Sequence, residues 1–183
     1  MQVLIVSVVL PVTYLSIVFV NITITEVCIV LSMAQSLSKI YLHLIFHVKS
    51  DSPKIKEADI ARVCAYIGQL IKVAGCDNII VGGMPDHIHA LFVLSRNVAV
   101  AQVVEEIKRN SSRWLKGVDD DYRFFAWQRG YGVFSVSQSG IDGAIRYIAH
   151  QHEHHHKLSF ADEYRRLLDL YKVDYDEKFL LSD

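Results

Sequence analysis

Hydrophobic and polar residues alternate along residues 37–48, a pattern typical of a half-buried β-strand. Successive side chains of a strand point to opposite faces of the sheet. We therefore expect one face of this strand to be buried.

Two longer segments have the period of amphipathic helices. The first follows Ser52-Pro53 and ends near Gly75. Its apolar positions are Ile60, Val63, Cys64, Ile67 and Ile71. The second helix is marked by Val100, Val103, Val104, Ile107, Ser111 and Trp114. An apolar helix face needs a partner surface, so these helices are expected to cover a sheet.

Short β-branched or aromatic runs complete this sheet. Residues 78–81 and 87–94 flank the turn residues of 82–86, which predicts an antiparallel hairpin. Residues 123–127 and 132–136 predict one or two further strands. The order β-α-β-β-α-β indicates an α+β fold of the ferredoxin-like or RRM-like kind, with a four-stranded antiparallel sheet and both helices on one face. The other face of the sheet would then be free for a ligand.

Two segments beyond this core also have helical character, residues 141–156 and residues 160–171. The first carries Tyr147 and Gln151, which at a spacing of i and i+4 share one face of a helix. We therefore expect a C-terminal tyrosine-bearing helix in addition to the core.

Residues 1–32 differ in composition from the rest of the chain, because Glu26 is their only charged residue. A span of about 20 apolar residues can cross a membrane. This stretch, however, has no basic residue before Lys39 and contains Pro11 among β-branched residues. We interpret it as an extension that is not part of the native domain, with residues 33–183 as a single domain and no membrane association.

The composition is that of an ordinary globular domain, with 51% hydrophobic and 21% charged residues in a chain of 183. These values exclude a disordered chain and a small disulfide scaffold. The cysteines, Cys28, Cys64 and Cys76, are odd in number and form no CxxC pair, which favours reduced thiols in the cytoplasm.

The net charge of −1 gives no overall signal for a polyanionic partner, so any nucleic-acid surface must be local. The candidates for DNA contact cluster on the second helix: Lys108, Arg109, Arg113 and Lys116. Glu105 and Glu106 lie beside them. Charge alone favours a solvated helix face here.

The first candidate for chemistry is His87-Ile88-His89, because alternate residues of a strand place both imidazoles on one face. Two nitrogen ligands leave coordination positions open for a phosphate and for water, as a catalytic divalent ion requires. A pair of hydrogen-bonded histidines on a sheet face is the alternative.

The second candidate is Tyr147. A tyrosine phenolate can attack phosphorus and conserve the bond energy in a covalent phosphotyrosine. The amide oxygen of Gln151 could add a neutral third metal ligand beside it. A helical tyrosine is more often a packing residue, and only its combination with His87 and His89 favours catalysis.

At these residues the sequence resembles the HUH-type single-tyrosine transposases of the insertion-sequence 200/605 group. The hallmarks of that family are a His-hydrophobe-His strand and a later helical Tyr-Ile-x-x-Gln. Here residues 85–89 read Pro-Asp-His-Ile-His and residues 147–151 read Tyr-Ile-Ala-His-Gln. Further family-like segments are residues 38–43, 127–137, 153–156 and 160–164.

The resemblance implies a homodimer that binds hairpins at the ends of a mobile element and cleaves single-stranded DNA. Tyr147 would be the nucleophile and would leave a 5′-phosphotyrosine. His87, His89 and Gln151 would hold Mg²⁺ or Mn²⁺, and because these ligands are neutral we expect weak binding until a DNA phosphate joins them. The resemblance also implies that the histidines and the tyrosine of one site come from different subunits.

Two departures from the family pattern are His150, where asparagine is frequent, and the 32-residue lead. Two other functions stay open: a non-catalytic module that binds single-stranded nucleic acid, and a domesticated relative that processes genomic hairpins without transposing. The aromatic signature of RRM domains is missing, which disfavours the first. We interpret the histidines of residues 150–156 as an exposed helix end.

Overall fold

The computed structural model describes residues 36–151 and 159–180. The chain divides into two units, residues 1–37 and 38–183, and the fold below is that of the second unit. The extension of residues 1–32 and the histidines at 152–156 lie outside the described residues. The domain boundary at Met33 therefore stays a prediction.

Four antiparallel strands form one sheet in the order β2-β3-β1-β4. Their bounds are β1 Tyr41–His47, β2 Asp77–Met84, β3 His87–Val93 and β4 Gly132–Val136. The central strands pair from Tyr41 opposite Val93 to His47 opposite His87. This sheet confirms the predicted α+β, ferredoxin-like class.

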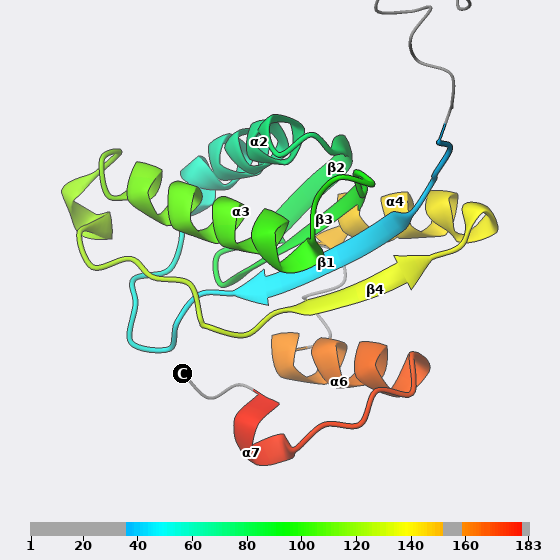
Figure 1. Cartoon of the computed structure of the whole chain (residues 1–183). Helices are drawn as coiled ribbons and strands as arrows, with labels where there is room; N and C mark the ends of the chain where they lie inside the picture. The colour runs from blue at the N-terminus through cyan, green and yellow to red at the C-terminus, as the bar shows by residue number, and fades with distance from the viewer. Residues whose placement is uncertain (1–35, 152–158, 181–183) are drawn as a thin grey trace, which may run out of the picture. The chain divides into compact units, whose positions relative to one another are not determined.

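Helices α2 (Glu57–Val73) and α3 (Val100–Leu115) cover one face of the sheet (Figure 1). They pack on side chains that alternate along the central strands. Those strand residues are Leu42, Leu44 and Phe46 of β1 and Ile88, Ala90 and Phe92 of β3. The main core lies between these two layers, as the helical and strand periodicities of the sequence predict.

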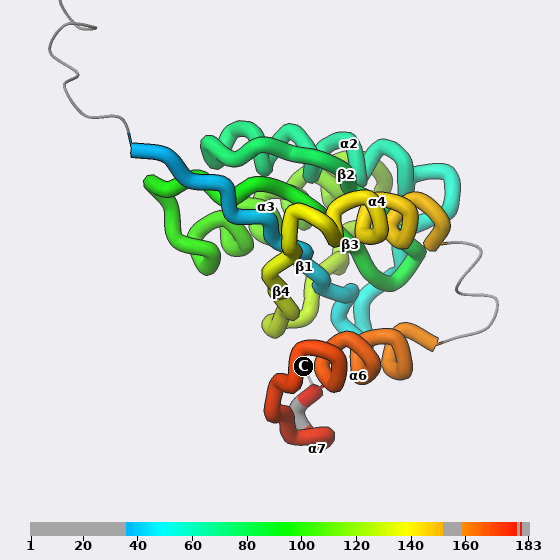
Figure 2. Tube along the Cα trace, turned by 90° about the vertical axis from the view of Figure 1, so that its right-hand side faces the viewer, coloured from blue at the N-terminus to red at the C-terminus, as the bar shows by residue number. Residues whose placement is uncertain are grey.

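The opposite face is not free, which corrects the expectation from the sequence. Helix α4 (Ile141–Ala149) packs on β2 and β3, and α6 (Phe160–Leu170) packs on the other half of the sheet. Ile45 and Phe134 form a second apolar cluster there with Leu168 of α6. Figure 2 shows α6 and α7 (Glu177–Leu180) on the side of the sheet away from α2.

Gly82 sets how closely α4 approaches the sheet. A Cβ atom at this position would lie 2.6 Å from the carbonyl oxygen of Ile148. Gly82 pairs with His89 across the β2–β3 ladder. The backbone of α4 therefore lies against the strands directly beside the histidine pair.

Two expected elements differ from the sequence prediction. Residues 123–127 form no strand, and only an isolated bridge joins Val48 to Trp127. This segment follows the 3₁₀ helix Asp120–Tyr122 and buries Phe125 and Trp127 in the core instead of extending the ladder.

The helix predicted for residues 141–156 is interrupted within the described residues, because α4 ends at Ala149, His150 is a turn and Gln151 is again helical. His150 follows with φ −106° and ψ 27°, and its ring Nδ1 and its backbone N–H both bond to the carbonyl of Arg146. Such local side-chain bonds compete with helix continuation. Within residues 36–151 and 159–180, no helix is long and apolar enough to cross a membrane.

Candidate active site

The side chains of His87 and His89 project from β3 on the sheet face that α4 and α6 cover, and both residues are fully buried. Ile88 between them points into the main core. The ring of His87 stacks on Phe160 of α6, with 4.6 Å between the ring centroids. The strand alternation that the sequence predicts thus places both imidazoles in one enclosed site.

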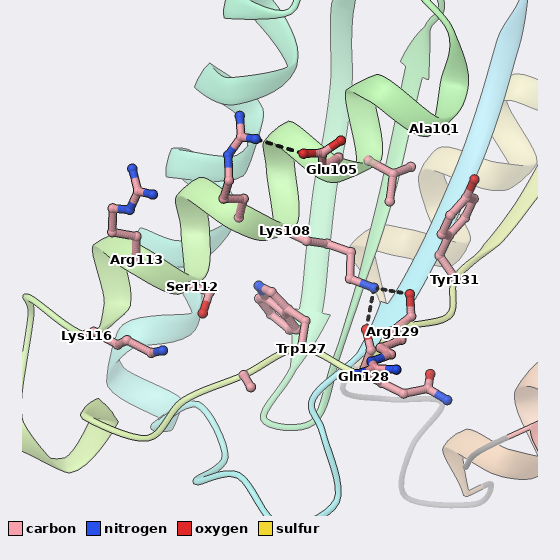
Figure 3. A pocket seen from close by; sticks show the side chains of 13 residues that line it. Ala101, Glu105, Lys108, Ser112, Arg113, Lys116, Trp127, Gln128, Arg129 and Tyr131 are labelled. Carbon is pink, nitrogen blue, oxygen red and sulfur yellow. Dashed lines mark hydrogen bonds and ion pairs between the residues drawn. The ribbon is translucent and has the colours of Figure 1, made fainter. Parts of the chain in front are cut away.

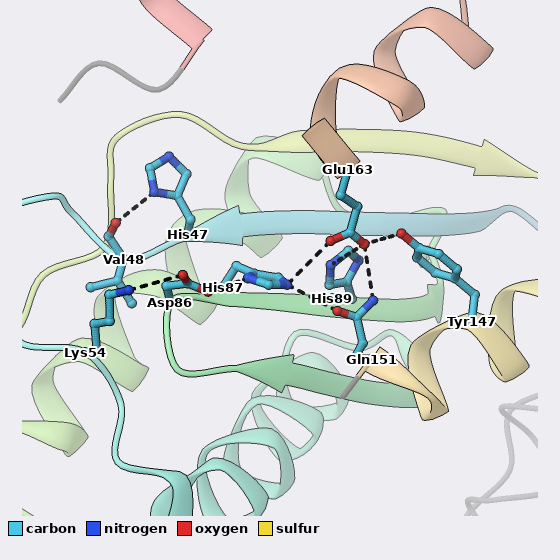
Figure 4. Close-up of polar contacts among 9 residues, drawn as sticks. All are labelled: His47, Val48, Lys54, Asp86, His87, His89, Tyr147, Gln151 and Glu163. Atoms are coloured by element: carbon cyan, nitrogen blue, oxygen red, sulfur yellow. Dashed lines mark hydrogen bonds and ion pairs between the residues drawn. The ribbon is translucent and has the colours of Figure 1, made fainter. Parts of the chain in front are cut away.

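Asp86 determines which ring nitrogen of His87 carries the proton, and Figure 4 shows the two residues side by side. Its Oδ1 lies 2.7 Å from His87 Nδ1 and accepts a hydrogen bond from it. This bond, more than the nearby Lys54, holds the pKa of Asp86 well below its usual range. With the proton on Nδ1, the Nε2 lone pair of His87 faces into the site, which is the tautomer that a metal ligand needs.

Gln151 lies just beyond α4 and is buried. Its Nε2 donates to Glu163 Oε1 at 3.3 Å, so its Oε1 is turned to His87 Nε2 at 3.1 Å. Two acceptor atoms therefore face each other when His87 is neutral. Such a contact is favourable only when a cation or an extra proton lies between the atoms.

Glu163 of α6 is the site residue that sequence reasoning missed. It is 4% exposed, and its carboxylate lies 3.4 Å from His89 Nε2 and 3.8 Å from His87 Nε2. Ligand atoms of these three residues all lie within 4.8 Å of one another. The site thus carries a negative charge, whereas the sequence predicted only neutral ligands.

Tyr147 reaches the same carboxylate from α4, and its hydroxyl donates a hydrogen bond to Glu163 Oε1. Its ring stands edge-on to His89, with 5.9 Å between the centroids. Burial, followed by the bond to Glu163, raises the pKa of Tyr147 above its usual range. Figure 4 shows Tyr147, Gln151 and the histidine pair turned toward Glu163.

These residues meet within one chain, whereas the resemblance implies that the tyrosine comes from a second subunit. Residues 137–140, the joint between β4 and α4 through which such an exchange would pass, form a 3₁₀ turn at Gln138–Gly140. Gln138 Oε1 accepts a hydrogen bond of 2.8 Å from the hydroxyl of Tyr41 on β1. The joint is therefore folded onto the sheet in the single chain.

His43 of β1 lies within hydrogen-bonding distance of His89. Its Nε2 lies 3.0 Å from His89 Nδ1. Burial lowers the pKa of His43 to about 4, and the charge of Glu163 only partly offsets that effect. A neutral His43 can accept the Nδ1 proton of His89, which leaves His89 Nε2 facing Glu163.

The donor set fits a divalent cation. It combines two imidazoles, an amide oxygen and a carboxylate, and the hydrogen bonds of Asp86 and His43 can hold the proton of each imidazole away from the site. Carboxylate and carbonyl oxygens suit Mg²⁺ and Mn²⁺, while imidazoles suit transition metals. His87, His89, Gln151 and Glu163 are thus the residues that could hold an ion.

The basic residues predicted for DNA contact differ in their surroundings (Figure 3). Lys108 turns inward, where its Nζ donates to backbone carbonyls of residues 128–130, and burial lowers its pKa to about 8. Arg109 pairs with Glu105 and Glu106. Arg113 and Lys116 remain exposed.

Comparison with known proteins adds to this geometry. The model of the family described as "Transposase IS200 like" matches residues 36–151, more than half of the chain. The chain belongs to the family of IS200-like transposases. The match ends at Gln151, so it contains the histidine pair and Tyr147. Glu163 lies beyond it.

Two solved structures share the transposase fold. One is a candidate transposase from Deinococcus radiodurans R1, with 19% identity and a TM-score of 0.51, covering 64% of this chain and 95% of that chain. The other is a REP-associated tyrosine transposase bound to a REP hairpin, with 12% identity and a TM-score of 0.51, covering 82% and 92%. None of the curated proteins compared with the chain matches it.

Proposed function

We propose that this transposase is a metal-dependent endonuclease and strand transferase for single-stranded DNA, acting at hairpin-bearing element ends as a homodimer. The observation that carries the proposal is the meeting of Tyr147 and the histidine pair on one buried carboxylate. A nucleophile, a candidate proton acceptor and side chains suited to binding a metal ion thereby lie together in one site.

In this mechanism the oxygen of Tyr147 attacks the phosphorus of a DNA phosphodiester. The new O–P bond leaves a 5′-phosphotyrosine, while the bond to the 3′ oxygen breaks and that oxygen leaves as a hydroxyl after it takes a proton from water. Glu163 already accepts the hydrogen bond of Tyr147, so its carboxylate is positioned to take the phenolic proton. Attack by a 3′-hydroxyl on the phosphotyrosine reverses the step and joins strands.

His87, His89 and Gln151 would hold Mg²⁺ or Mn²⁺, and the Oε2 atom of Glu163 faces the same position as His87 Nε2. A bound ion supplies charge neutralisation at the phosphate and positions it for attack. Asp86 and His43 keep the two imidazoles in the tautomers that leave Nε2 free to bind it.

Access to this site requires a movement of α6. Both histidines are fully buried, and Phe160 of α6 stacks on His87. A phosphodiester can reach the histidines only when Phe160 moves off the ring of His87. The REP hairpin held by the related transposase supports a structured DNA end as the substrate.

The decisive experiment uses a labelled single-stranded oligonucleotide that carries a hairpin, incubated with the protein and Mn²⁺ and run on a denaturing gel. The wild-type chain should give a protein-linked 5′ product. Tyr147→Phe should bind the hairpin and give no adduct, since only the attacking oxygen is lost. Tyr66→Phe is the matched control. The ring of Tyr66 stacks on Trp114 on the other side of the sheet, so this variant should react normally.

An adduct formed by Tyr147→Phe would show that another residue is the nucleophile. Hairpin binding without any covalent product from the wild-type chain, in Mg²⁺ and in Mn²⁺, would favour a non-catalytic binding module. The position of hairpin-bearing repeats around the gene would separate a mobile element from a domesticated relative, because both would perform the same chemistry.

A further inference from the structure

Helix α6 turns one flank toward the edge strand β4. An atom of the Tyr164 ring lies 2.7 Å from where a Cβ atom of Gly132 would stand. Leu168, one turn further along α6, packs in an apolar cluster with Phe134 of β4. The opposite flank of α6 therefore faces away from β4, toward the half of the sheet on which α4 packs.

Arg166 lies on that second flank. An α-helix turns by about 100° per residue, so Tyr164 stands about 100° to one side of Glu163 and Arg166 about 60° to the other side. Glu163 itself reaches α4, where it accepts the hydroxyl hydrogen bond of Tyr147 (Figure 4). Residues three apart are neighbours on the surface of a helix. Arg166 therefore follows Glu163 along the side of α6 that faces the proposed nucleophile.

The charge of Arg166 acts on the hydroxyl of Tyr147. Burial raises the pKa of Tyr147 most, the hydrogen bond and the charge of Glu163 raise it further, and the positive charge of Arg166 opposes these effects. Within residues 36–151 and 159–180, Arg166 is the only cation with such an effect on Tyr147. The guanidinium thus lies within electrostatic range of the oxygen that is proposed to attack phosphorus.

The guanidinium of Arg166 is available to an anion. The side chain is exposed, and in the part of the chain that the structure describes it forms no hydrogen bond or ion pair. Its neighbour Arg165 differs, because it bonds to both carboxylate oxygens of Glu177, at 2.8 and 3.1 Å, and to Asp162. Arg165 thus ties α7 to α6, while the N–H donors of Arg166 face solvent beside the site.

A guanidinium in this place suits a phosphodiester. When a phenolic oxygen attacks phosphorus, negative charge gathers on the non-bridging oxygens, and donors aimed at that charge lower the barrier. The planar fork of an arginine donates two parallel hydrogen bonds to such oxygens and is always charged in proteins. The proposed metal ligands His87 and His89 act from the sheet, whereas Arg166 approaches from α6.

We propose that Arg166 is a catalytic residue that binds the non-bridging oxygens of the scissile phosphate and stabilises the charge that forms there as Tyr147 attacks. The inference rests on the proposed function, because it adds a residue to that reaction. The bond from the Tyr147 oxygen to phosphorus forms, and the bond from phosphorus to the 3′ oxygen breaks. Arg166 donates hydrogen bonds and gives up no proton, so Glu163 remains the proton acceptor.

The first measurement is the single-turnover rate at which the protein-linked 5′ product forms in Mn²⁺, with the hairpin oligonucleotide at a saturating concentration. Arg166→Gln should react about 100-fold more slowly than the wild-type chain, because a donor to developing negative charge is lost. Arg166→Lys keeps the charge without the fork, so its rate should lie between the two. Hairpin affinity in EDTA should fall far less than the rate.

The second measurement removes the charge from the DNA instead of from the protein. A methylphosphonate is placed at the cleavage position, which is first located with the wild-type chain. Its methyl group replaces the charged oxygen, so the linkage has no negative charge for Arg166 to neutralise. The wild-type chain and Arg166→Gln should then react at equal rates, because two changes that remove the same interaction are not additive. A merely structural role of Arg166 would slow both substrates by the same factor.

Arg165→Gln is the matched control, since it makes the same change of charge on the same helix and breaks only exposed ion pairs. It should form the adduct at the wild-type rate. A normal rate for Arg166→Gln, an equal loss in Arg165→Gln, or the same loss on the methylphosphonate would overturn the role of Arg166 and leave the proposed function intact. A wild-type chain that forms no adduct would overturn both.

Discussion

Tyr147 of α4 donates its hydroxyl hydrogen bond to Glu163 of α6, across the face of the sheet that carries the histidine pair. The same carboxylate also accepts from Gln151 Nε2 and lies 3.4 Å from His89 Nε2. One side chain thus links the nucleophile, the proposed metal ligands and the helix that covers them. Its negative charge adds to the effect of burial in raising the pKa of Tyr147.

Glu163→Gln should weaken metal binding in the absence of DNA. The substitution keeps the shape of the side chain but removes the only negative charge among the four proposed donors, so we expect the affinity for Mn²⁺ to fall about 10–100-fold. Titration of Mn²⁺ followed by electron paramagnetic resonance measures it directly. Asp169→Asn, an exposed change on the same helix, is the control, and equal affinities of the two variants would remove Glu163 from the metal site.

Asp86→Asn should act on the metal through His87. The amide can no longer hold the proton on Nδ1 as the carboxylate does at 2.7 Å, so a larger fraction of His87 carries its proton on Nε2. We expect a loss of about 10–100-fold in Mn²⁺ affinity, with hairpin binding unchanged in EDTA. Asp51→Asn breaks an exposed pair with Lys49 and should change neither value. Full Mn²⁺ affinity in Asp86→Asn would contradict this role.

His43 should make the metal-free protein less stable as the pH falls from about 6.5 to about 4. The pKa of His43 is lowered to about 4 by burial, so in this window the unfolded chain takes up a proton that the folded chain excludes. The free energy of unfolding should therefore decrease with falling pH, by about 3 kcal/mol in total from this residue. Glu163, His89 and Tyr147 face His43, and comparing variants separates the contribution of His43 from that of its neighbours.

Urea unfolding in EDTA at several pH values gives this dependence. His43→Gln should flatten it relative to the wild-type chain, whereas the exposed His150→Gln should not. Parallel curves for the wild-type chain and His43→Gln would mean that His43 takes up its proton equally in the folded and the unfolded states.

Gly82→Ala should separate α4 from the sheet. The added Cβ atom would lie 2.6 Å from the carbonyl oxygen of Ile148, so the helix must shift and carry Tyr147 with it. We expect a loss of about 1–3 kcal/mol in the free energy of unfolding and a lower yield of adduct. Gly143 also lies on α4, but a Cβ atom added there would have no atom within 4 Å. Gly143→Ala should therefore leave the free energy of unfolding unchanged or raise it by up to about 1 kcal/mol. Equal stability of the two variants would refute the close packing.

A chain that begins at Met33 should keep the fold and the cleavage activity. The described sheet and its helices all lie after residue 36, and β1 begins at Tyr41. Circular dichroism, thermal unfolding and the adduct gel compare the two lengths. A shortened chain that fails to fold would make residues 1–32 part of the domain.

The repeating patterns of the sequence were sufficient for most of the core. The apolar spacing of Ile60, Val63, Ile67 and Ile71 predicts a helix face that is buried in the structure, and the alternation at His87-Ile88-His89 predicts which side chains share a face. Both patterns are local, because the helical and strand periods follow from the backbone alone. The same patterns failed at residues 123–127, where aromatic side chains fill the core without a ladder.

The sequence by itself therefore determined the sheet with two helices on one face, the histidine pair and the tyrosine as candidates, and the basic character of α3. Only the tertiary structure decided that α4 and α6 cover the second face of the sheet, that Glu163 enters the site, that His43 bonds to His89, and that Lys108 turns inward. Glu163 lies 16 residues beyond Tyr147 on another helix, and His43 lies 46 residues before His89. Such contacts depend on how helices pack against a sheet, and no local period of the chain encodes that packing.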